Sequence, residues 1–565
     1  MPELSASAPA LVWLRAKGNE AKETVYSAGR LVGHEHNGRA RVQLDSTDKT
    51  GTVIAASSSD VLPRNGPGTR PDSCQLLHLN EACVLENIAA RFADGDIYTW
   101  TSHVLTAVNP YEELPLYADD LVRQLPTLAP RNLPPHAFSV AELAVRNVRK
   151  GAQAVVVSGE SGAGKTVTMS HVMTYITRRT PNAGGSDGDL GLRLGHLLLK
   201  SNPVLEAFGN AQTVRNHNSS RFGKFIKVAF DPSGTRMCGM ELKTYLLEKT
   251  RVVSFGPGER TYHVFYALLA GASTQQSERW GLRTKEDHIL TARASDSDAA
   301  VAEGTASKFT ELRVALSALT VRQEEQADIL GLVSSIMHLC DVRFVPLEDS
   351  SDGGCRPVGS AALSHAVKLL GCPSISLKLI QRVIRSPRGG ADAQEPITVP
   401  LSAEQASAAR DALCKAVYLA LFDHICRRFN EAASLIGAQL RHVEQKQRAK
   451  AGLHISESRA QLRRHHGNND AEKASPIPLA SPPGPTSLGS AYEANYAEKP
   501  WSPPAAGASP AAILSPAAVL SPASGASADC EKFIGLLDMF GFETFAVNSL
   551  EQVRGPAPEP ASPCR

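Results

Sequence analysis

Gly159-Glu160-Ser161-Gly162-Ala163-Gly164-Lys165-Thr166 is the stretch that decides the fold of this chain. The apolar run 154–157 precedes it and a helical pattern over 167–178 follows it, so the glycines lie between a strand and a helix. In that context the pattern G-x-x-x-x-G-K-[ST] cradles phosphate, because backbone N–H groups converge on one anion and the helix N-terminus adds its positive dipole end. An ordinary glycine-rich turn between a strand and a helix is the alternative.

Two side chains of this stretch carry the expected chemistry. Lys165 is expected to reach the terminal phosphates of a nucleotide, and Thr166 to offer its hydroxyl to Mg²⁺. The sequence therefore predicts a phosphate-bearing ligand held together with a magnesium ion.

Length and composition favour a soluble intracellular protein. The 565 residues leave room for about two to four domains. The net charge of +2 gives no global attraction to nucleic acid, so we expect no nucleic-acid partner. No apolar run approaches the ~20 residues that span a bilayer, and the start does not resemble a signal peptide. We therefore expect a cytoplasmic protein without a transmembrane segment.

Cysteine and histidine spacing gives no metal motif. The ten cysteines are scattered without a C-x-x-C pair, and no histidine spacing suits zinc. His338 and His424 lie within helical patterns and are expected to be structural. The cysteines are interpreted as reduced thiols, most of them small buried hydrophobes.

The chain begins with short strands and then changes to mixed α/β texture. Residues 8–62 contain strand patterns separated by turn residues such as Asn37-Gly38, which predicts a small N-terminal β-barrel or a meander. Asn80 then precedes a helical pattern and is expected to cap it. Residues 402–430 read as one long amphipathic helix.

The segment 216–224 combines two hydroxyls, an arginine and two amides beside strand patterns. Such side chains are unsuited to a core and suit a loop that closes over a charged ligand. A polar hairpin is the alternative.

Residues 441–528 differ in composition from the rest. A basic stretch rich in Gln and His passes into Pro/Ala/Ser low complexity, and such a composition cannot bury enough apolar area to offset its ordering entropy. We therefore expect a disordered insert; the basic part is interpreted as solvated, with an acidic partner as the alternative. Order is expected to return at 533–543, a buried strand that ends in Asp538 and leads through a glycine turn to Glu543.

These pieces together resemble the motor domain of myosin. Residues 159–166 are identical to the phosphate loop of that family, 216–224 resemble its first switch, N-x-N-S-S-R-F-G-K, and 538–543 resemble its second switch, with Met539 in place of Ile. Residues 109–117 resemble its adenine loop. The resemblance covers 76–430 and resumes at 533.

The resemblance implies an α/β fold: a P-loop NTPase with a central twisted, mostly parallel sheet flanked by helices, preceded by the small N-terminal β-barrel. It implies a motor core over 76–440, comprising the nucleotide-binding and upper actin-cleft parts. After the insert 441–528, residues 529–553 would carry the second switch and the start of the relay helix, and 554–565 would form an irregular tail.

The resemblance also implies roles for individual residues in binding and hydrolysing Mg-ATP. The phosphates would be held by Asn216 and by the loop residues Gly159, Glu160, Ser161, Gly162, Ala163, Gly164, Lys165 and Thr166. Thr166 and Ser220 would ligate the metal, with Asp538 holding it through water, while Asn109 and Tyr117 would flank the adenine. Ser219 and the backbone of Gly541 would contact the γ-phosphate and the attacking water. Arg221 and Glu543 would form the salt bridge that closes the pocket.

Three departures from the family pattern are visible. Glu112 and Glu113 stand where basic residues are usual in the adenine loop, and the insert 441–528 is longer than the usual connection. The helix expected after Phe545 meets proline-rich residues 554–560, so we expect a motor fragment without converter and with most of the actin-binding subdomain missing.

The predicted function is that of a myosin-type, actin-based motor and P-loop ATPase associated with the cytoskeleton. An actin filament would be its partner, weakened or lost by truncation, with light chains only in a full-length form. The alternative is a non-motile, nucleotide-binding interaction protein derived from a motor domain. A kinase or another P-loop enzyme would leave the two switch-like segments unexplained.

Overall fold

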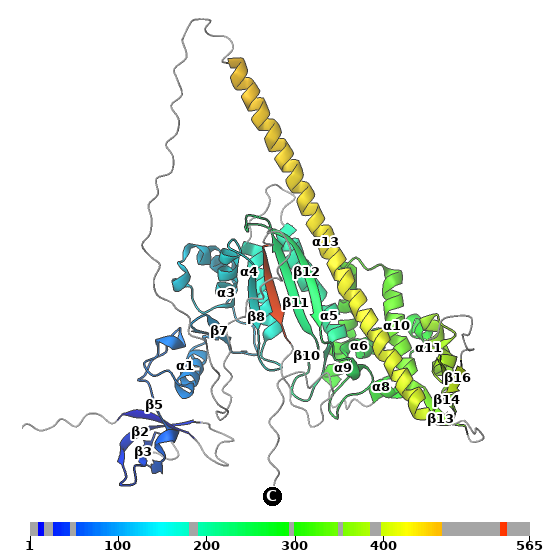
Figure 1. Ribbon diagram of the computed structural model, residues 1–565, viewed down its shortest axis with the longest axis horizontal. Helices are drawn as coiled ribbons and strands as arrows, with labels where there is room; N and C mark the ends of the chain where they lie inside the picture. The colour runs from blue at the N-terminus through cyan, green and yellow to red at the C-terminus, as the bar shows by residue number, and fades with distance from the viewer. Residues whose placement is uncertain are drawn as a thin grey trace, which may run out of the picture. The chain divides into compact units, whose positions relative to one another are not determined.

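The computed structural model describes most of the chain, namely residues 10–15, 26–45, 52–179, 190–292, 299–347, 354–384, 397–465 and 532–539. The chain divides into two compact units. The first comprises Met1–Glu444 together with Cys530–Arg565, and the second comprises Gln445–Asp529. Figure 1 labels many elements of the first unit, which contains the sheets and the candidate site.

The N-terminal strands form an antiparallel sheet in the order β4-β3-β2-β1-β5. Its strands are β1 (Leu11–Arg15), β2 (Tyr26–His34), β3 (Ala40–Leu44), β4 (Val53–Ala56) and β5 (Val61–Pro63). Residues alternate between buried and exposed along β3, so Ala40, Val42 and Leu44 face a small separate core. Among the described residues no ladder joins β4 to β5 at the two ends of this row, so a closed barrel is not shown.

The expected helix cap at Asn80 is confirmed. Helix α1 (Glu81–Ala93) begins directly after it, and the Asn80 side-chain oxygen accepts a hydrogen bond from the Cys83 backbone N–H at 3.0 Å. The hairpin of β6 (Tyr98–Thr101) and β7 (Val104–Ala107) follows and leads to Asn109.

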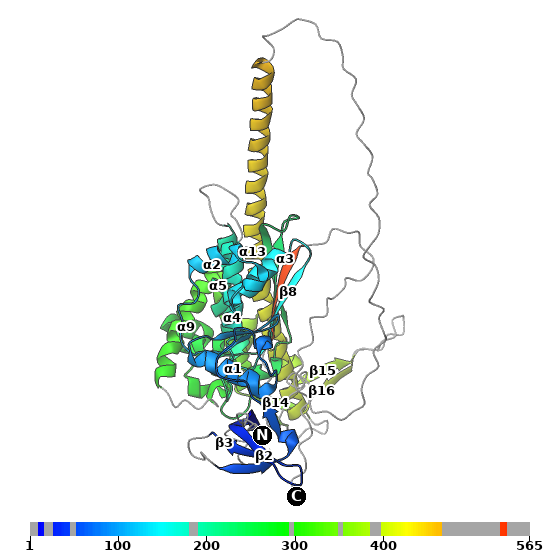
Figure 2. The same ribbon diagram turned by 90° about the vertical axis from the view of Figure 1, so that its left-hand side faces the viewer.

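The central sheet has the strand order β12-β11-β17-β8. Strand β17 (Phe533–Asp538) pairs in parallel with β8 (Gln153–Val157) and antiparallel with β11 (Gly223–Phe230), and β11 pairs antiparallel with β12 (Met237–Tyr245). Figure 2 shows β17 in red beside β8.

The expectation of a mostly parallel sheet is therefore wrong for the described strands, which form a mixed sheet with one parallel pair. The physical reason lies in the connection between β11 and β12. It is a tight turn closed by the hydrogen bond from Asp231 N–H to the Arg236 carbonyl, and a turn this short can join only antiparallel strands.

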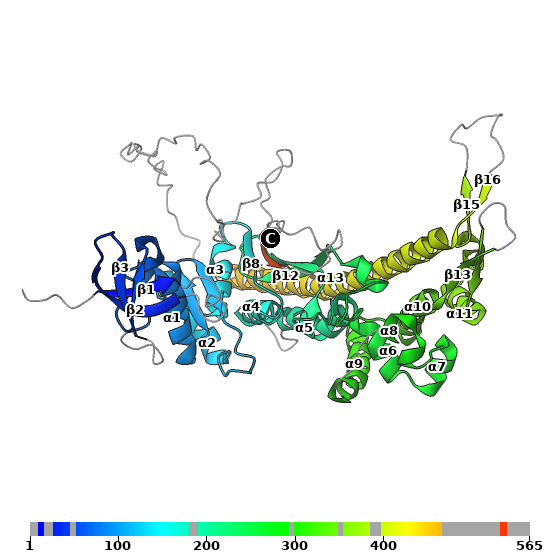
Figure 3. The ribbon, with the colours of Figure 1, turned by 90° about the horizontal axis from the view of Figure 1, so that it is seen from below.

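Helices pack against this sheet and bury its apolar side chains. They include α3 (Ala137–Asn147), α4 (Lys165–Arg179) and α5 (Leu190–Gly209), and Figure 3 shows α4 and α5 along one side of the strands. Helix α5 contains Pro203 in its interior and ends at Gly209. Ile176, Phe208 and Leu536 belong to one large core and have no exposed surface.

Further helices and short strand pairs make up much of the rest of the described part of the chain. The helices are α2 (Asp119–Gln124), α6 (His263–Gly271), α7 (Thr274–Trp280), α8 (Ile289–Ala292), α9 (Ala299–Ala318), α10 (Gln323–Asp341), α11 (Ser360–Leu370) and α12 (Ile375–Lys378). The short strand pairs are β9 (Asn210–Ala211) with β10 (Ser219–Ser220), β13 (Arg343–Pro346) with β14 (Cys355–Val358), and β15 (Gln381–Ile384) with β16 (Ile397–Pro400).

Helix α13 (Ala403–His465) is longer than the sequence pattern predicts. Tyr418 anchors it to α5 through a hydrogen bond from its hydroxyl to the Phe208 carbonyl at 2.7 Å, and Asn430 bonds both backbone groups of Leu242 on β12.

The end of α13 corrects the expected start of the disordered insert, because residues 441–465 are helical. They are rich in Gln, Lys, Arg and Ala, which favour helix, and contain no proline. The remainder of that insert, 466–528, lies outside the described residues, as do 540–565. None of the helices in the described part of the chain combines the length and apolar character that crossing a membrane requires.

Candidate functional site

The glycine stretch forms a loop between β8 and α4, as its flanks predict. Gly162 and Gly164 have φ angles of +85° and +86°, a conformation that side-chain-bearing residues rarely adopt. The loop is held from outside by Asn109, whose side-chain N–H donates to the Gly162 carbonyl at 2.8 Å. Helix α4 begins at Lys165, so the N–H groups of its first turn point toward the loop.

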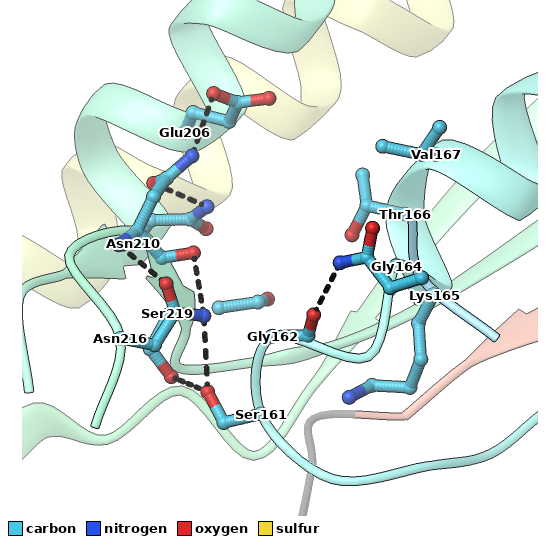
Figure 4. A pocket seen from close by; sticks show the side chains of 13 residues that line it. Ser161, Gly162, Gly164, Lys165, Thr166, Val167, Glu206, Asn210, Asn216 and Ser219 are labelled. Atoms are coloured by element: carbon cyan, nitrogen blue, oxygen red, sulfur yellow. Dashed lines mark hydrogen bonds between the residues drawn. The ribbon is translucent and has the colours of Figure 1, made fainter. Parts of the chain in front are cut away.

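A cavity of about 230 Å³ opens between this loop and the segment that faces it (Figure 4). One wall comes from the loop and the first turn of α4, and the other from the end of α5 and the segment leading to β10. The lining residues are Asn109, Ser161, Gly162, Gly164, Lys165, Thr166, Val167, Glu206, Asn210, Asn216, Asn218, Ser219 and Ser220.

The ammonium group of Lys165 lies against its own loop. Its Nζ donates to the carbonyl oxygens of Gly159 and Glu160 at 2.9 and 2.8 Å. A lysine ammonium has three donors and strongly prefers anionic acceptors. A phosphate entering the cavity would therefore compete for Lys165 with two neutral carbonyl oxygens.

Thr166 and Asp538 meet although 372 positions separate them. The Thr166 hydroxyl donates to Asp538 Oδ2 at 3.1 Å, because β17 pairs with β8 and brings its last residue to the start of α4. A hydroxyl beside a carboxylate is an oxygen ligand set that suits Mg²⁺.

A buried lysine accompanies this carboxylate. Lys224 lies opposite Asp538 in the β11–β17 ladder, and both residues are less than one tenth exposed. Burial raises the pKa of Asp538, opposed by Lys224, the Thr166 hydroxyl and Lys165. Burial likewise lowers the pKa of Lys224, opposed by Asp538 and Glu206. Each charge thus offsets part of the desolvation of the other.

The first switch-like segment faces the glycine loop through direct hydrogen bonds. The Ser161 and Ser219 hydroxyl oxygens are 2.9 Å apart, and Asn216 Nδ2 donates to Ser161 Oγ at 3.2 Å. Ser220 lines the same cavity and donates its hydroxyl hydrogen bond to the Phe222 carbonyl. The structure therefore brings Asn216, Ser219 and Ser220 to the loop, as the sequence predicts.

Three polar lining residues were not predicted as site residues. Glu206 Oε2 accepts from Asn218 Nδ2 at 3.3 Å, and Asn218 Oδ1 accepts from Asn210 Nδ2 at 3.0 Å. Asn218 lies inside the switch-like motif, so its position could have indicated it. Glu206 and Asn210 stand at the end of a helix, where the sequence pattern shows only a helix stop.

Tyr117 does not line the cavity. Its ring stacks on the His171 ring with centroids 3.5 Å apart and planes 9° apart, and its hydroxyl oxygen is 2.8 Å from that of Tyr98. Asn109, the other predicted adenine neighbour, does line the cavity. The role of Tyr117 at a bound base stays a prediction.

Other predicted residues are placed differently. Gly159, Glu160 and Ala163 belong to the loop but do not line the cavity. Gly541 and Glu543 lie outside the described residues, so the predicted pairing of Arg221 with Glu543 lies outside them as well.

Arg221 has a buried partner that the sequence did not predict. Its Nε donates to Glu248 Oε2 at 2.5 Å, and its Nη1 donates to Ser219 Oγ at 3.1 Å. Arg251 shares Glu248 at 3.0 Å and also contacts Glu259 at 3.2 Å. We call these four charged residues (Arg221, Glu248, Arg251 and Glu259) the buried arginine–glutamate network. Glu248 and Arg251 are three positions apart, but Arg221 joins them only through the tertiary fold, so no local spacing identifies the whole network.

The loop between a strand and a helix, with an aspartate from the neighbouring parallel strand beside it, is the arrangement of a P-loop NTPase fold. Residues 70–443 match the family described as Myosin head (motor domain), and the chain belongs to this family. The second switch-like segment lies beyond the matched residues.

Curated relatives agree with this assignment. Myosin heavy chain 95F of Drosophila melanogaster is 35% identical over 454 residues, which is 75% of this chain and 35% of the relative. Unconventional myosin-VI of Bos taurus is 34% identical over 422 residues, 69% of this chain and 32% of the relative. Myosin-5 of Arabidopsis thaliana is 38% identical over 368 residues, which is 64% of this chain and 23% of the relative. The chain thus spans about a third or less of the length of these relatives.

Proposed function

We propose that this chain binds Mg-ATP in the cavity between the glycine loop and the 216–220 segment and hydrolyses it as a myosin-type motor. The observation that carries the proposal is that two segments line one cavity and are hydrogen-bonded to each other. The glycine loop with Lys165 forms one wall of the cavity. Asn216, Ser219 and Ser220 form the other. Membership of the myosin head family supports the same assignment.

The residues present fit a magnesium-bound triphosphate. Hydroxyl oxygens of Thr166 and Ser220 line the cavity, and the Asp538 carboxylate is hydrogen-bonded to Thr166, which gives an oxygen-only donor set. Thr166 and Ser220 would hold the ion directly and Asp538 through water. When bound, the ion neutralises charge that develops on the phosphates during transfer.

The chain's own residues would divide the remaining work between binding and closure. The loop N–H groups and Lys165 would bind the phosphates, and Lys165 would leave the carbonyls of Gly159 and Glu160 to do so. Asn216 would orient the phosphates and Asn109 the adenine, with Tyr117 beside it. Placement of groups, rather than covalent chemistry, accounts for most of the rate in this class of reaction.

The attacking water would be positioned by the switch-like segments. The Ser219 hydroxyl and the Gly541 backbone are proposed to hold the water and the γ-phosphate. Arg221 and Glu543 are proposed to pair when the pocket closes and to exclude bulk water. Arg221 Nη1 donates a 3.1 Å hydrogen bond to the Ser219 hydroxyl oxygen, so a shift of the guanidinium group would also move or reorient this hydroxyl.

The proposed partner is filamentous actin, and the proposed place of action is the actin cytoskeleton. Both rest on the family, whose description names a motor domain. Within the chain we propose 76–440 as the nucleotide-binding and upper actin-cleft part of that domain, and 529–553 as the second switch with the start of the relay helix.

Nucleotide binding and turnover test the proposal together. The purified chain is titrated with Mg-ATP by calorimetry and its phosphate release is measured, with Lys165→Ala as the variant and Lys200→Ala, an exposed lysine on α5, as the matched control. We expect binding and turnover in the wild type and in Lys200→Ala, and neither in Lys165→Ala. Equal ATP affinity in Lys165→Ala would overturn the site, whereas binding without turnover would favour the non-motile interaction protein.

A further inference from the structure

Three buried side chains from separate parts of the sequence gather at the end of α10. His288 stands just before α8, and His338 and Asp341 belong to the last turn of α10. One potential ligand atom from each lies within 4.8 Å of the other two. The two histidines are 0% and 1% exposed, and none of the three lines the nucleotide cavity. The group is therefore a separate polar centre inside an apolar core.

The geometry fixes which nitrogen of His338 carries the proton. Its Nε2 lies 2.8 Å from the Trp280 carbonyl oxygen, which can only accept, so Nε2 donates. Its Nδ1 then carries a lone pair, and this atom is buried with no hydrogen-bond partner among the described residues. A second proton on this atom would be buried without an acceptor, so the geometry favours the neutral ring. A neutral imidazole whose N–H is tied to a backbone carbonyl is oriented as metal-binding histidines usually are.

Asp341 and His288 complete the set. Asp341 Oδ1 accepts from the Ile289 backbone N–H at 2.8 Å, and its Oδ2 lies 2.7 Å from His288 Nδ1. The Arg283 backbone N–H donates to His288 Nε2 at 3.2 Å, so His288 holds its proton on Nδ1 and shares it with the carboxylate. One carboxylate oxygen is thus anchored by the backbone, and the other faces the histidines.

We propose that His288, His338 and Asp341 bind one transition-metal ion of the Zn²⁺ type. Two imidazole nitrogens and one carboxylate oxygen suit Zn²⁺ and its neighbours, whereas Mg²⁺ and Ca²⁺ require oxygen donors. The three residues would supply three ligands, and a water molecule would take the fourth tetrahedral position. The unpartnered His338 Nδ1 gains through this ion the interaction that it lacks in the protein alone.

Binding requires two local changes. The ion takes the place of the proton shared by His288 and Asp341, so that proton moves to His288 Nε2 and the 3.2 Å bond from Arg283 N–H opens. The Arg283 guanidinium, which contacts Asp341 Oδ2 at 2.5 Å, has to turn outward; its side chain is 47% exposed, so solvent is within reach. Arg283 and the metal ion are therefore competitors for one carboxylate.

Zinc titration of the metal-stripped full chain without nucleotide tests the site, with calorimetry for stoichiometry and Co²⁺ absorption as a probe of nitrogen ligation. His338→Gln is the main variant, because a Gln amide can still donate to the Trp280 carbonyl while it lacks Nδ1. His365→Ala is the matched control. The His365 ring stacks on the His338 ring with centroids 5.1 Å apart, but His365 is not among the proposed ligands.

We expect one Zn²⁺ per wild-type chain, at least about 10-fold weaker binding in His338→Gln, and unchanged binding in His365→Ala. Arg283→Gln should bind more tightly than the wild type, because the competing cation is gone. Asp341→Asn is a second ligand variant with the same expected loss. The proposal is overturned if the wild type binds no Zn²⁺ at micromolar concentrations, or if His338→Gln and Asp341→Asn both bind as it does.

Discussion

Replacing Glu248 by alanine removes the carboxylate that lies between two buried guanidinium groups. Its side chain is 8% exposed, and those of Arg221 and Arg251 are 4% and 1% exposed. Arg251 keeps Glu259 at 3.2 Å, whereas Arg221 loses a 2.5 Å charge-assisted bond and keeps its bond to the Ser219 hydroxyl. Both guanidinium groups therefore lose their charge-assisted bond to the same buried carboxylate.

The magnitude follows from this burial. Breaking a buried ion pair by removing one partner costs about 3–5 kcal/mol, because the remaining charge stays desolvated. At about 1.4 kcal/mol per decade, the folding equilibrium constant should fall by a factor of about 10² to 4 × 10³. Glu241→Ala is the matched control, because Glu241 pairs with Lys243 at 3.4 Å while both side chains are about half exposed. An exposed pair of this kind contributes about 0.2–1 kcal/mol.

Urea denaturation followed by circular dichroism measures both variants against the wild type. We expect Glu248→Ala to unfold at a clearly lower urea concentration and Glu241→Ala to remain close to the wild type. Rescue of part of the loss by the double variant Glu248→Ala/Arg221→Met would assign the effect to the ion pair between these two side chains. If Glu248→Ala loses no more stability than Glu241→Ala, the buried arginine–glutamate network does not stabilise the fold as described.

Three further predictions concern the loop, a helix cap and the pH response. Gly164→Ala should weaken ATP binding at least 10-fold, since Gly164 has φ +86° and a side chain there strains the phosphate loop; calorimetry with Gly239→Ala as control measures it. Asn80→Ala should destabilise the fold by about 1 kcal/mol in urea denaturation through loss of the α1 cap, whereas Asn80→Ser should retain most of it. The buried His136 and His338 have pKa values lowered to about 4, so the unfolded chain binds protons more readily than the folded one between pH 6.5 and 4. Thermal stability should therefore fall as the pH drops through that window, and a flat profile would contradict it.

Local sequence predicted the loop wall of the site well. The spacing of glycines between a strand and a helix determines where Gly162, Gly164, Lys165 and Thr166 lie, because the motif is a short-range structure with its own hydrogen bonds. The approach of Asp538 to Thr166 could be expected only from the family resemblance, since no local pattern links positions 372 apart.

Tertiary choices account for what the sequence did not predict. Arg221 could pair with any acidic residue that the fold brings near, and the selection of Glu248 depends on the path of the chain after β12. Lys224 occupies a buried position of β11. The alternating pattern of the strand predicts an apolar residue at such a position, and it gives no indication that Asp538 lies opposite Lys224 in the sheet. Helix α13 passes its expected end near Asn430 because helix-forming residues continue beyond the apolar pattern that ends there.

The position of β17 has a consequence for how the protein is made. Strands β8 and β11 leave the ribosome long before β17, which lies between them in the finished sheet. At about 5–20 residues per second, some 300 residues from the end of β11 to the end of β17 take about 15–60 s to synthesise. During that interval the edges of β8 and β11 that later pair with β17 lack this partner strand. Such open strand edges can pair with other strands or be bound by chaperones. Asp538 arrives with that strand, so the nucleotide pocket is completed only after β17 has been made and has paired.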